Sequence, residues 1–271
     1  MLFHETGEQP HMNFETIKFA VDGNVATITM NRPERLNACS LGMADDMLRA
    51  LDHLGDARAL VITGEGRAFC SGADLTASGE RPVTGAQGSY MALTEKYNPL
   101  MMKLARLDVP VICAVNGPAA GIGCSIALAG DFVIAGASAY FLQAFVNIGL
   151  VPDGGSSWML PRLIGKARAT EMMMLGEKIG PEKACEWGMI YKAVADESLT
   201  GETQALATRL ANGPTVSYAT IRKNILTALE NSYAQALQAE AEGQRLAGGT
   251  DDAREGSMAF VEKRKPAFQG R

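Results

Sequence analysis

The chain has 271 residues, a formal net charge of −5, a hydrophobic fraction of 47% and a charged fraction of 20%, as in an ordinary globular protein. Its acidic balance disfavours a nucleic-acid partner, and the lack of 18 consecutive apolar residues disfavours a membrane span. Five cysteines without a C-x-x-C pair predict neither a disulfide framework nor a metal site, and they favour a reducing, cytoplasmic location.

The first residues carry no pattern typical of a folded element. Residues 1–12 lack the basic and apolar regions of a secretory signal, so we expect a flexible extension there. Two β-rich runs follow at 16–21 and 25–30, and the Asp-Gly-Asn sequence between them is typical of a tight turn. The folded part is therefore predicted to open with an antiparallel hairpin.

Helix and strand patterns then alternate up to about residue 141. We expect helices over 43–54, 89–107 and 123–129, and strands over 59–63, 111–115, 132–135 and 139–141. Alternation at this spacing predicts an α/β fold with parallel strands, in which ligands bind where strands end and helices begin. Residues 76–88, rich in Gly, Ser and Thr, predict a mobile loop between two of these elements.

After residue 198 the strand pattern ends and only helices are predicted. Their expected ranges are 199–211, 214–229, 234–246 and 251–264. Ile221, Ile225 and Leu229 recur at helical spacing, so this apolar face needs cover from the core or from another subunit. We therefore divide the chain into an extension over 1–12, a core with the site over 13–198, and a helical C-terminal region over 199–271.

Few charged side chains are available for chemistry between residues 109 and 161, where Asp131 and Asp153 are the only ones. Two glycine-bearing turns, at 69–75 and 116–124, are the candidates for a site. Neither matches the spacing of a phosphate loop or of a dinucleotide-binding turn. Such turns offer backbone N–H groups that can hold an anion or a developing oxyanion, but their glycines could equally serve tight packing alone.

Several motifs occur in the order and spacing of a known family. They are Arg-Pro-Glu-Arg-Leu-Asn-Ala at 32–38, Phe-Cys-Ser-Gly-Ala-Asp-Leu at 69–75, Asn-Gly-Pro-Ala-Ala-Gly-Ile-Gly at 116–123, Gly-Leu-Val-Pro-Asp-Gly-Gly at 149–155, Leu-Pro-Arg at 160–162 and Phe-Val-Glu-Lys-Arg at 260–264. From residue 14 to 268 the chain thus resembles the crotonase superfamily of enoyl-CoA hydratases and isomerases. The resemblance implies a spiral of ββα turns, a C-terminal region that joins subunits into homotrimers or homohexamers, and acyl-CoA substrates without a separate cofactor.

The resemblance also implies roles for individual residues. The backbone N–H groups of Ala73 and Ile122 would form an oxyanion hole for the thioester carbonyl. The positions that would contact CoA or the acyl group are Arg35, Leu36, Ala38, Ser71, Gly72, Asp74, Leu75, Gly121, Ser125, Phe145, Phe260 and Lys263. The last two of these would reach CoA from a neighbouring subunit.

One departure from the family pattern bears on the reaction. Hydratases use two glutamates, since adding water to a double bond needs acid and base assistance at both ends. Those two positions hold Ser125 and Phe145 here. Isomerases similar to this chain, including the Δ3,Δ2-enoyl-CoA and the ring-1,2-epoxyphenylacetyl-CoA isomerases, carry a single acid at the position of Asp153, and moving one proton needs one base.

Three interpretations of the chain remain open. The first is an isomerase with Asp153 as proton shuttle, the second is a hydratase in which Asp153 and a water do the work of two glutamates, and the third is a non-catalytic acyl-CoA-binding protein. Asp153 itself could instead cap the helix that follows it or form an Asx turn. The sequence leaves the identity of the acyl group open.

The remaining polar and sulfur-bearing residues receive structural interpretations. Asp131, at the start of a strand, is expected to be a structural hydrogen-bonding residue. The methionines at 172–174 are expected to fill the core, and Cys70 and Cys124 are expected to be small packing residues because no histidine accompanies them.

Overall fold

The Asp-Gly-Asn turn near the N-terminus joins the first two strands, as predicted. β1 (Ile17–Asp22) and β2 (Val25–Met30) pair antiparallel, and Gly23 in the turn has φ +55°, a left-handed value suited to glycine. The computed structural model describes residues 13–74 and 83–271. The extension predicted over 1–12 lies outside these residues.

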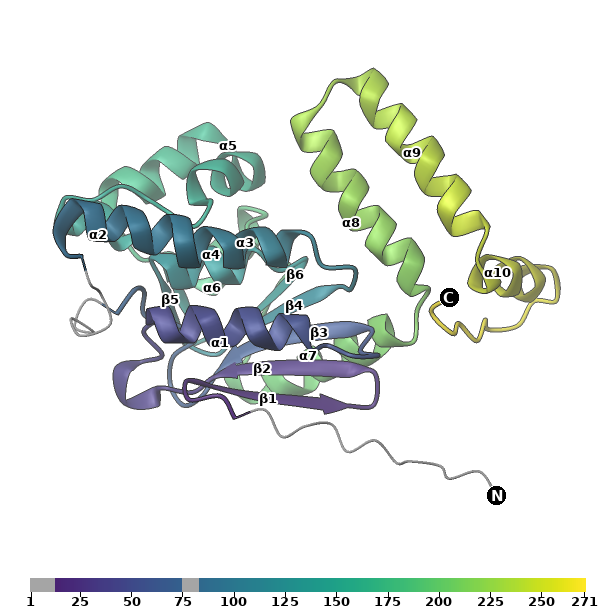
Figure 1. Cartoon of the computed structure of the whole chain (residues 1–271), viewed down its shortest axis with the longest axis horizontal. Helices are drawn as coiled ribbons and strands as arrows, with labels where there is room; N and C mark the ends of the chain where they lie inside the picture. Colours follow the sequence, from purple (N-terminus) through teal and green to yellow (C-terminus); the bar gives the residue numbers. More distant parts are fainter. Residues whose placement is uncertain (1–12, 75–82) are drawn as a thin grey trace.

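Six strands form the central sheet of the described chain (Figure 1). Their spatial order is β1, β2, β3 (Ala59–Gly64), β4 (Val111–Val115), β6 (Phe132–Gly136) and β8 (Lys192–Val194). From β2 onward all neighbouring strands are parallel, as the α/β pattern predicted. β5 (Pro118–Ala120) and β7 (Tyr140–Leu142) form a separate parallel pair.

Helices connect these strands and continue to the C-terminus. The α-helices are α1 (Leu41–Asp52), α2 (Gly85–Ala92), α3 (Asn98–Ala105), α4 (Ile122–Leu128), α5 (Ser156–Leu175), α6 (Pro181–Glu186), α7 (Leu199–Ala211), α8 (Thr215–Glu230), α9 (Tyr233–Gly248) and α10 (Asp251–Val261). Short turns of other helix types are η1 (Pro33–Arg35), η2 (Leu93–Tyr97), η3 (Ala144–Ile148) and η4 (Asp196–Ser198). The single helix expected over 89–107 is instead α2 and α3 joined by the π-helical turn η2, and α2 begins within the loop expected over 76–88.

The two faces of the sheet pack against different helices. Alternate residues of β3, such as Leu60 and Ile62, lie in the cluster that includes α1, α3 and α4. Ala59 and Val61 point the other way, into a smaller cluster that contains α7. The helix α7 therefore completes the core, although the predicted domain division assigns it to the C-terminal region.

α8 and α9 form a helical hairpin that projects from the sheet and its covering helices (Figure 1). Arg222 on α8 ties this hairpin to the core, because its Nε lies 2.6 Å from Asp131 Oδ2 and its Nη2 donates to Leu104 O at 2.9 Å. Asp131 Oδ2 also accepts from Val111 N at 2.7 Å. Asp131 is therefore a structural residue, as predicted.

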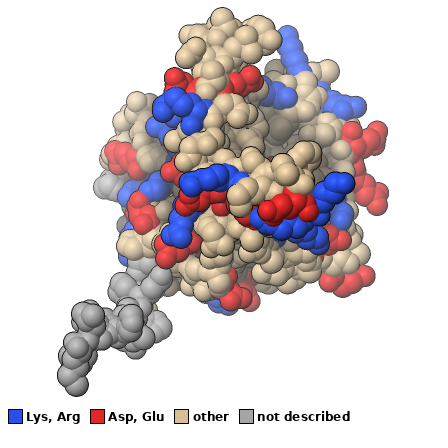
Figure 2. All heavy atoms as spheres, turned by 90° about the vertical axis from the view of Figure 1, so that its right-hand side faces the viewer, with Lys and Arg blue, Asp and Glu red and all other residues tan. Residues whose placement is uncertain are grey.

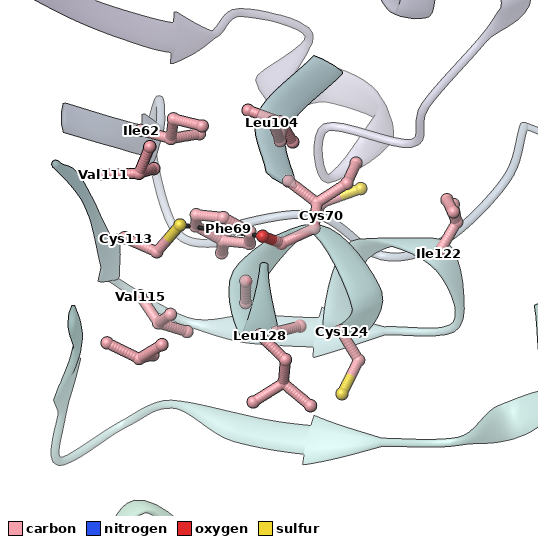
Figure 3. Packing of buried hydrophobic residues seen from close by; sticks show 14 of the residues in the cluster. Ile62, Phe69, Cys70, Leu104, Val111, Cys113, Val115, Ile122, Cys124 and Leu128 are labelled. Atoms are coloured by element: carbon pink, nitrogen blue, oxygen red, sulfur yellow. Dashed lines mark hydrogen bonds between the residues drawn. The ribbon is translucent and has the colours of Figure 1, made fainter. Parts of the chain in front are cut away.

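Buried sulfur atoms fill the core beneath the predicted site (Figure 3). Cys70 and Cys124 are fully buried, and burial raises the pKa of Cys70 to about 11 and that of Cys124 to about 12. Both thiols stay protonated and act as small packing groups, as predicted. Among the three methionines at 172–174, Met172 is buried, but the expectation of core filling is wrong for Met174, which is 70% exposed.

Acidic and basic side chains are interspersed on the face shown in Figure 2, which carries no broad area of a single sign. Within the described residues, no helix has both the length and the low charge required to cross a membrane.

Candidate active site

The two glycine-bearing turns lie against each other. Cys70 N donates to Pro118 O at 3.0 Å and Ala120 N donates to Cys70 O at 2.9 Å, so the first turn pairs with β5 at the start of the second. A Cβ on Gly121, which has φ +53°, would lie 3.7 Å from the Cα of Gly72. The backbones of the two turns are therefore in van der Waals contact, at the N-terminus of α4.

Two backbone amides at this contact are free to bind a ligand. Ile122 is the first residue of α4, so its N–H has no acceptor within the helix. The neighbours of Ala73 pair with Cys39 on one side, through Cys39 N to Gly72 O (2.7 Å) and Asp74 N to Cys39 O (3.0 Å). Within residues 13–74 and 83–271, neither the Ala73 nor the Ile122 N–H donates a hydrogen bond, which is the arrangement an oxyanion hole requires.

Both amides border a cavity of about 460 Å³. The two turns supply one wall, Ala92, Leu93 and Tyr97 on α2 and η2 supply another, and residues 144–153 supply the third. Among the described residues of its lining, Asp153 is the only one with a charged side chain. The cavity is thus mainly apolar, with two free backbone donors, one carboxyl group and a few uncharged polar side chains such as Ser89 and Asn147.

The carboxyl group of Asp153 has no partner among the described residues. Its Oδ1 is buried without a hydrogen bond, and burial raises the pKa of Asp153 to about 6. Helix α5 has Gly155 at its N-cap and receives no side-chain cap, so Asp153 does not cap the helix that follows it. With the capping interpretation excluded, the side chain remains available for chemistry.

Of the two positions that hold glutamates in hydratases, only one lines the cavity. Ser125 is fully buried on α4, outside the cavity lining, and its Oγ donates to the backbone carbonyl of Asp153 at 3.0 Å. Phe145 lines the cavity, and its Cζ would lie 3.6 Å from a Cβ on Gly121. Asp153 is therefore the only carboxyl group that the described lining offers to a substrate.

Residues 20–271 match the family model described as enoyl-CoA hydratase/isomerase. The chain belongs to this family. It is 44% identical over 260 residues to the 1,2-epoxyphenylacetyl-CoA isomerase of Escherichia coli K12, covering 95% of this chain and 99% of the relative. A protein of Rhodobacter capsulatus named as a probable enoyl-CoA hydratase is also 44% identical, over 96% of this chain and 100% of the relative.

Solved structures of this family have the same fold. The crystal structure of an enoyl-CoA hydratase from Polaromonas sp. JS666 superimposes with a TM-score of 0.88 at 31% identity, covering 93% of this chain and 99% of that one. The crotonase-like α/β fold predicted from the motifs is therefore confirmed. The protein is an enzyme of the enoyl-CoA hydratase/isomerase family.

The segment expected to contact CoA lies behind the first turn. Ser71 borders the cavity, and it binds this segment through Ser71 N to Leu36 O (3.0 Å) and Ser71 Oγ to Arg35 O (3.3 Å). Ala38 N in turn donates to Arg35 O at 3.0 Å. Arg35, Leu36 and Ala38 do not line the cavity themselves, so their contact with CoA stays a prediction.

Asp74 holds the first turn in place rather than lining the cavity. Its Oδ2 forms a largely buried ion pair with Arg32 Nη2 at 2.8 Å, and Arg32 Nη1 donates to Ala38 O at 2.8 Å. This pair ties the turn that carries Ala73 to the segment predicted to bind CoA. Leu75, the last residue of the motif, lies outside the described residues.

The C-terminal pair expected to bind CoA lies on the opposite side of the molecule from α2 (Figure 1). Phe260 on α10 is 85% exposed and borders a separate surface hollow, and Lys263 follows the end of that helix in exposed backbone. Neither residue approaches the cavity of its own chain. Their predicted role in a neighbouring subunit's site stays a prediction.

Two polar residues near the site were not identified from the sequence. Gln143 and Ser156 are fully buried, and Gln143 Nε2 donates to Ser156 Oγ at 2.9 Å. They lie 13 residues apart, on the strand end before η3 and at the start of α5. No local pattern marks such a pair, because only the fold brings the two side chains together.

Proposed function

We propose that this enzyme isomerises an unsaturated or epoxide acyl-CoA, with Asp153 as the proton shuttle. The observation that carries the proposal is the unpartnered carboxyl of Asp153 in a cavity that otherwise offers apolar walls and two backbone donors. A pKa of about 6 leaves this group mostly ionised at neutral pH yet more basic than an ordinary aspartate. The group is thus suited to take a proton from carbon and return it.

The proposed reaction on a 3-enoyl-CoA has two steps. The thioester oxygen accepts hydrogen bonds from the N–H groups of Ala73 and Ile122 while the Asp153 carboxylate removes a proton from C2, which leaves a dienolate. The carboxylic acid then returns this proton to C4, and the double bond moves from C3–C4 to C2–C3. Each donor stabilises the developing oxyanion by roughly 3 kcal/mol.

The proposal also includes a reaction without a separate cofactor and a substrate whose acyl group is uncharged. Both steps use a carboxyl group and backbone amides, so the CoA carried by the substrate is the only group they require. Apolar residues such as Ala92, Leu93 and Ile148 form the cavity walls, which supports an acyl group without charge. A charged acyl end would lose hydration there and find no oppositely charged side chain among the described residues of the lining.

We further propose a homotrimer or homohexamer in the cytoplasm, with the C-terminal region over 199–271 joining the subunits. Several apolar side chains of α8 are exposed in the single chain, including Ile221 (52%) and Ile225 (57%). Contiguous exposed apolar surface of this kind is typical of a subunit interface. The predicted contact of Phe260 and Lys263 with CoA belongs to this assembly.

A hydratase is the second candidate, favoured by the relative named as a probable enoyl-CoA hydratase at 44% identity. In this case Asp153 and an ordered water would replace two glutamates. Ser125 and Phe145 at the glutamate positions favour the isomerase. The third candidate, a non-catalytic acyl-CoA-binding protein, gives no reason to retain one buried carboxyl group that nothing compensates.

The variant Asp153→Asn tests the proposal. We expect the wild type to isomerise a 3-enoyl-CoA faster than it hydrates the 2-enoyl-CoA, and the variant to lose about 100-fold or more in kcat. KM should change little, because an amide keeps the shape of the acid but cannot take up the proton. Steady-state kinetics with both substrates give these values.

The control for this experiment is Asp22→Asn, which changes an exposed carboxyl at the end of β1. This control should keep wild-type kinetics. Normal isomerisation by Asp153→Asn would overturn the isomerase proposal. Rapid hydration of crotonyl-CoA by a wild type without isomerase activity would favour the hydratase instead.

A further inference from the structure

Three fully buried polar side chains form a continuous hydrogen-bonded row behind Asp153. Gln143 Nε2 donates to Ser156 Oγ at 2.9 Å, the Ser156 and Ser125 hydroxyls lie 2.7 Å apart, and Ser125 Oγ donates to Asp153 O at 3.0 Å. The row joins the strand end at Gln143, the start of α5 and the middle of α4. The row ends at the backbone carbonyl of Asp153.

The chemistry of the two ends restricts the directions that the hydrogen bonds in the row can take. The amide nitrogen of Gln143 can only donate, and the carbonyl of Asp153 can only accept. With Ser125 Oγ donating to Asp153 O, Ser156 supplies the hydrogen between the two hydroxyls. The opposite orientation of the Gln143 amide would make Ser156 donate to Gln143, and the single hydroxyl hydrogen of Ser125 would then serve either Ser156 or Asp153 but not both.

Close packing holds the same segment from another side. Gly154 has φ +59°, and a Cβ there would lie 2.4 Å from Ile122 Cδ1 and 2.7 Å from Ser125 Cβ. The residue next to Asp153 thus touches the residue that supplies an oxyanion donor. The carbonyl of Asp153 also accepts from Ser156 N at 3.1 Å, so it receives two hydrogen bonds.

We infer that Gln143, Ser156 and Ser125 are positioning residues, which fix the carboxyl of Asp153 relative to the Ile122 N–H by holding the Asp153 carbonyl. This inference rests on the proposed function. A hydrogen bond to the carboxyl group itself would stabilise its charged form and weaken it as a base. Hydrogen bonds to the backbone carbonyl orient the carboxyl group without weakening it as a base. Ser125, which makes one of these hydrogen bonds, stands at a position where hydratases carry a glutamate.

Ser125→Ala and Ser156→Ala test the inference. Each variant should lower kcat by about 10-fold to 100-fold with little change in KM, because a base displaced by a fraction of an ångström transfers protons poorly. A loosened carboxyl group is also better solvated, so the acidic limb of kcat/KM should move below its wild-type position near pH 6. A purely structural role would not move this limb.

Thr203→Ala is the matched control. Thr203 on α7 also carries a buried hydroxyl, whose Oγ1 has no partner among the described residues, and it lies on the helix that covers the other face of the sheet. This variant should keep the wild-type kcat and pH profile. The double variant Ser125→Ala/Asp153→Asn should be no slower than Asp153→Asn alone, because Ser125 acts only through Asp153.

Wild-type kcat and an unmoved acidic limb in both alanine variants would overturn the inference, as would an additive loss in the double variant. If Ser125→Ala does not fold, Ser125→Cys keeps the shape with a weaker donor, and wild-type kinetics in that variant overturn the inference as well. If Asp153→Asn is inactive but both serine variants have wild-type kinetics, the positioning roles are wrong and the proposed function stands. A fully active Asp153→Asn removes the proposed function itself.

Discussion

At the scale of single residues, the site depends on one carboxyl group that the fold leaves uncompensated. The proposed reaction depends on Asp153, and its place in the motif predicts this role from the sequence. Gln143 and Ser156 could not be predicted, because the contact between Ser125 and Ser156 joins residues 31 positions apart. Motif reasoning identifies groups that touch a substrate, whereas the groups behind them depend on tertiary packing.

Asp153 is expected to reduce stability at neutral pH. Its folded-state pKa of about 6 lies above the ordinary value of 3.8, so stability falls as the pH rises from 3.8 to about 6, and the full loss is present above that pH. Asp153→Asn should therefore increase the free energy of unfolding by about 1–2 kcal/mol at pH 7.5, after allowance for partial solvent screening. At pH 3 the two proteins should be equally stable, because the carboxyl is protonated in both states.

Urea denaturation at the two pH values measures this difference. Asp22→Asn, at an exposed position, serves as the control and should leave stability unchanged at both. An equal or lower stability of Asp153→Asn at pH 7.5 would mean that the carboxylate has a stabilising partner in the folded protein.

At the scale of elements, the site is the junction of two turns and the N-terminus of α4. The glycines in both turns could be recognised from the sequence, and so could most strands, since their apolar runs are long enough to form a pattern. The three-residue strands β5 and β8 were missed, although β7 of the same length was expected at 139–141; β5 lies within the glycine-bearing turn at 116–124. The π-helical turn η2 was also missed, since its sequence continues an ordinary helical pattern.

Gly121→Val should remove the oxyanion donor without unfolding the core. Gly121 has φ +53°, which a β-branched residue does not adopt readily, so the turn would rotate and displace the Ile122 N–H. We expect kcat to fall by about 100-fold or more. Gly188→Val is the control. Gly188 also has a positive φ, +74°, so valine strains the backbone there too. No atom of the described residues lies within 4 Å of the added Cβ, and Gly188 does not line the cavity.

Activity assays and circular dichroism on the two variants separate the effects. Gly188→Val should lose some stability and keep its turnover number. Wild-type turnover by Gly121→Val would show that the Ile122 amide does not stabilise the transition state.

At the scale of the whole molecule, the α8–α9 hairpin projects from the core (Figure 1), and apolar side chains on it such as Ile221, Ile225 and Leu229 are exposed in a single chain. The helices themselves could be predicted from the sequence to within a few residues, because their apolar positions recur regularly. The packing of α7 on the sheet could not, since helical periodicity gives the apolar face of a helix but not the surface that covers it.

Ile225→Asp should separate the subunits of the proposed assembly. Ile225 is 57% exposed in the single chain, and a carboxylate there would be costly to bury in an interface. Sedimentation velocity should show a trimer or hexamer for the wild type and smaller species for the variant. Val21→Asp, which changes an exposed residue of β1, should sediment as the wild type does.

A monomeric wild type with full affinity for CoA esters would argue against the proposed assembly. It would also remove the proposed contact of Phe260 and Lys263 with a neighbouring subunit's CoA.

In the proposed isomerisation, the protonated thiols beneath the cavity would protect the enzyme from its product. Conjugated 2-enoyl thioesters are electrophiles that thiolates attack, and Cys70 directly precedes a residue of the cavity wall. Burial raises the pKa of Cys70 to about 11, so almost none of it is ionised at neutral pH. Packing that excludes water from the core would therefore also disfavour self-alkylation if the proposed product forms beside it.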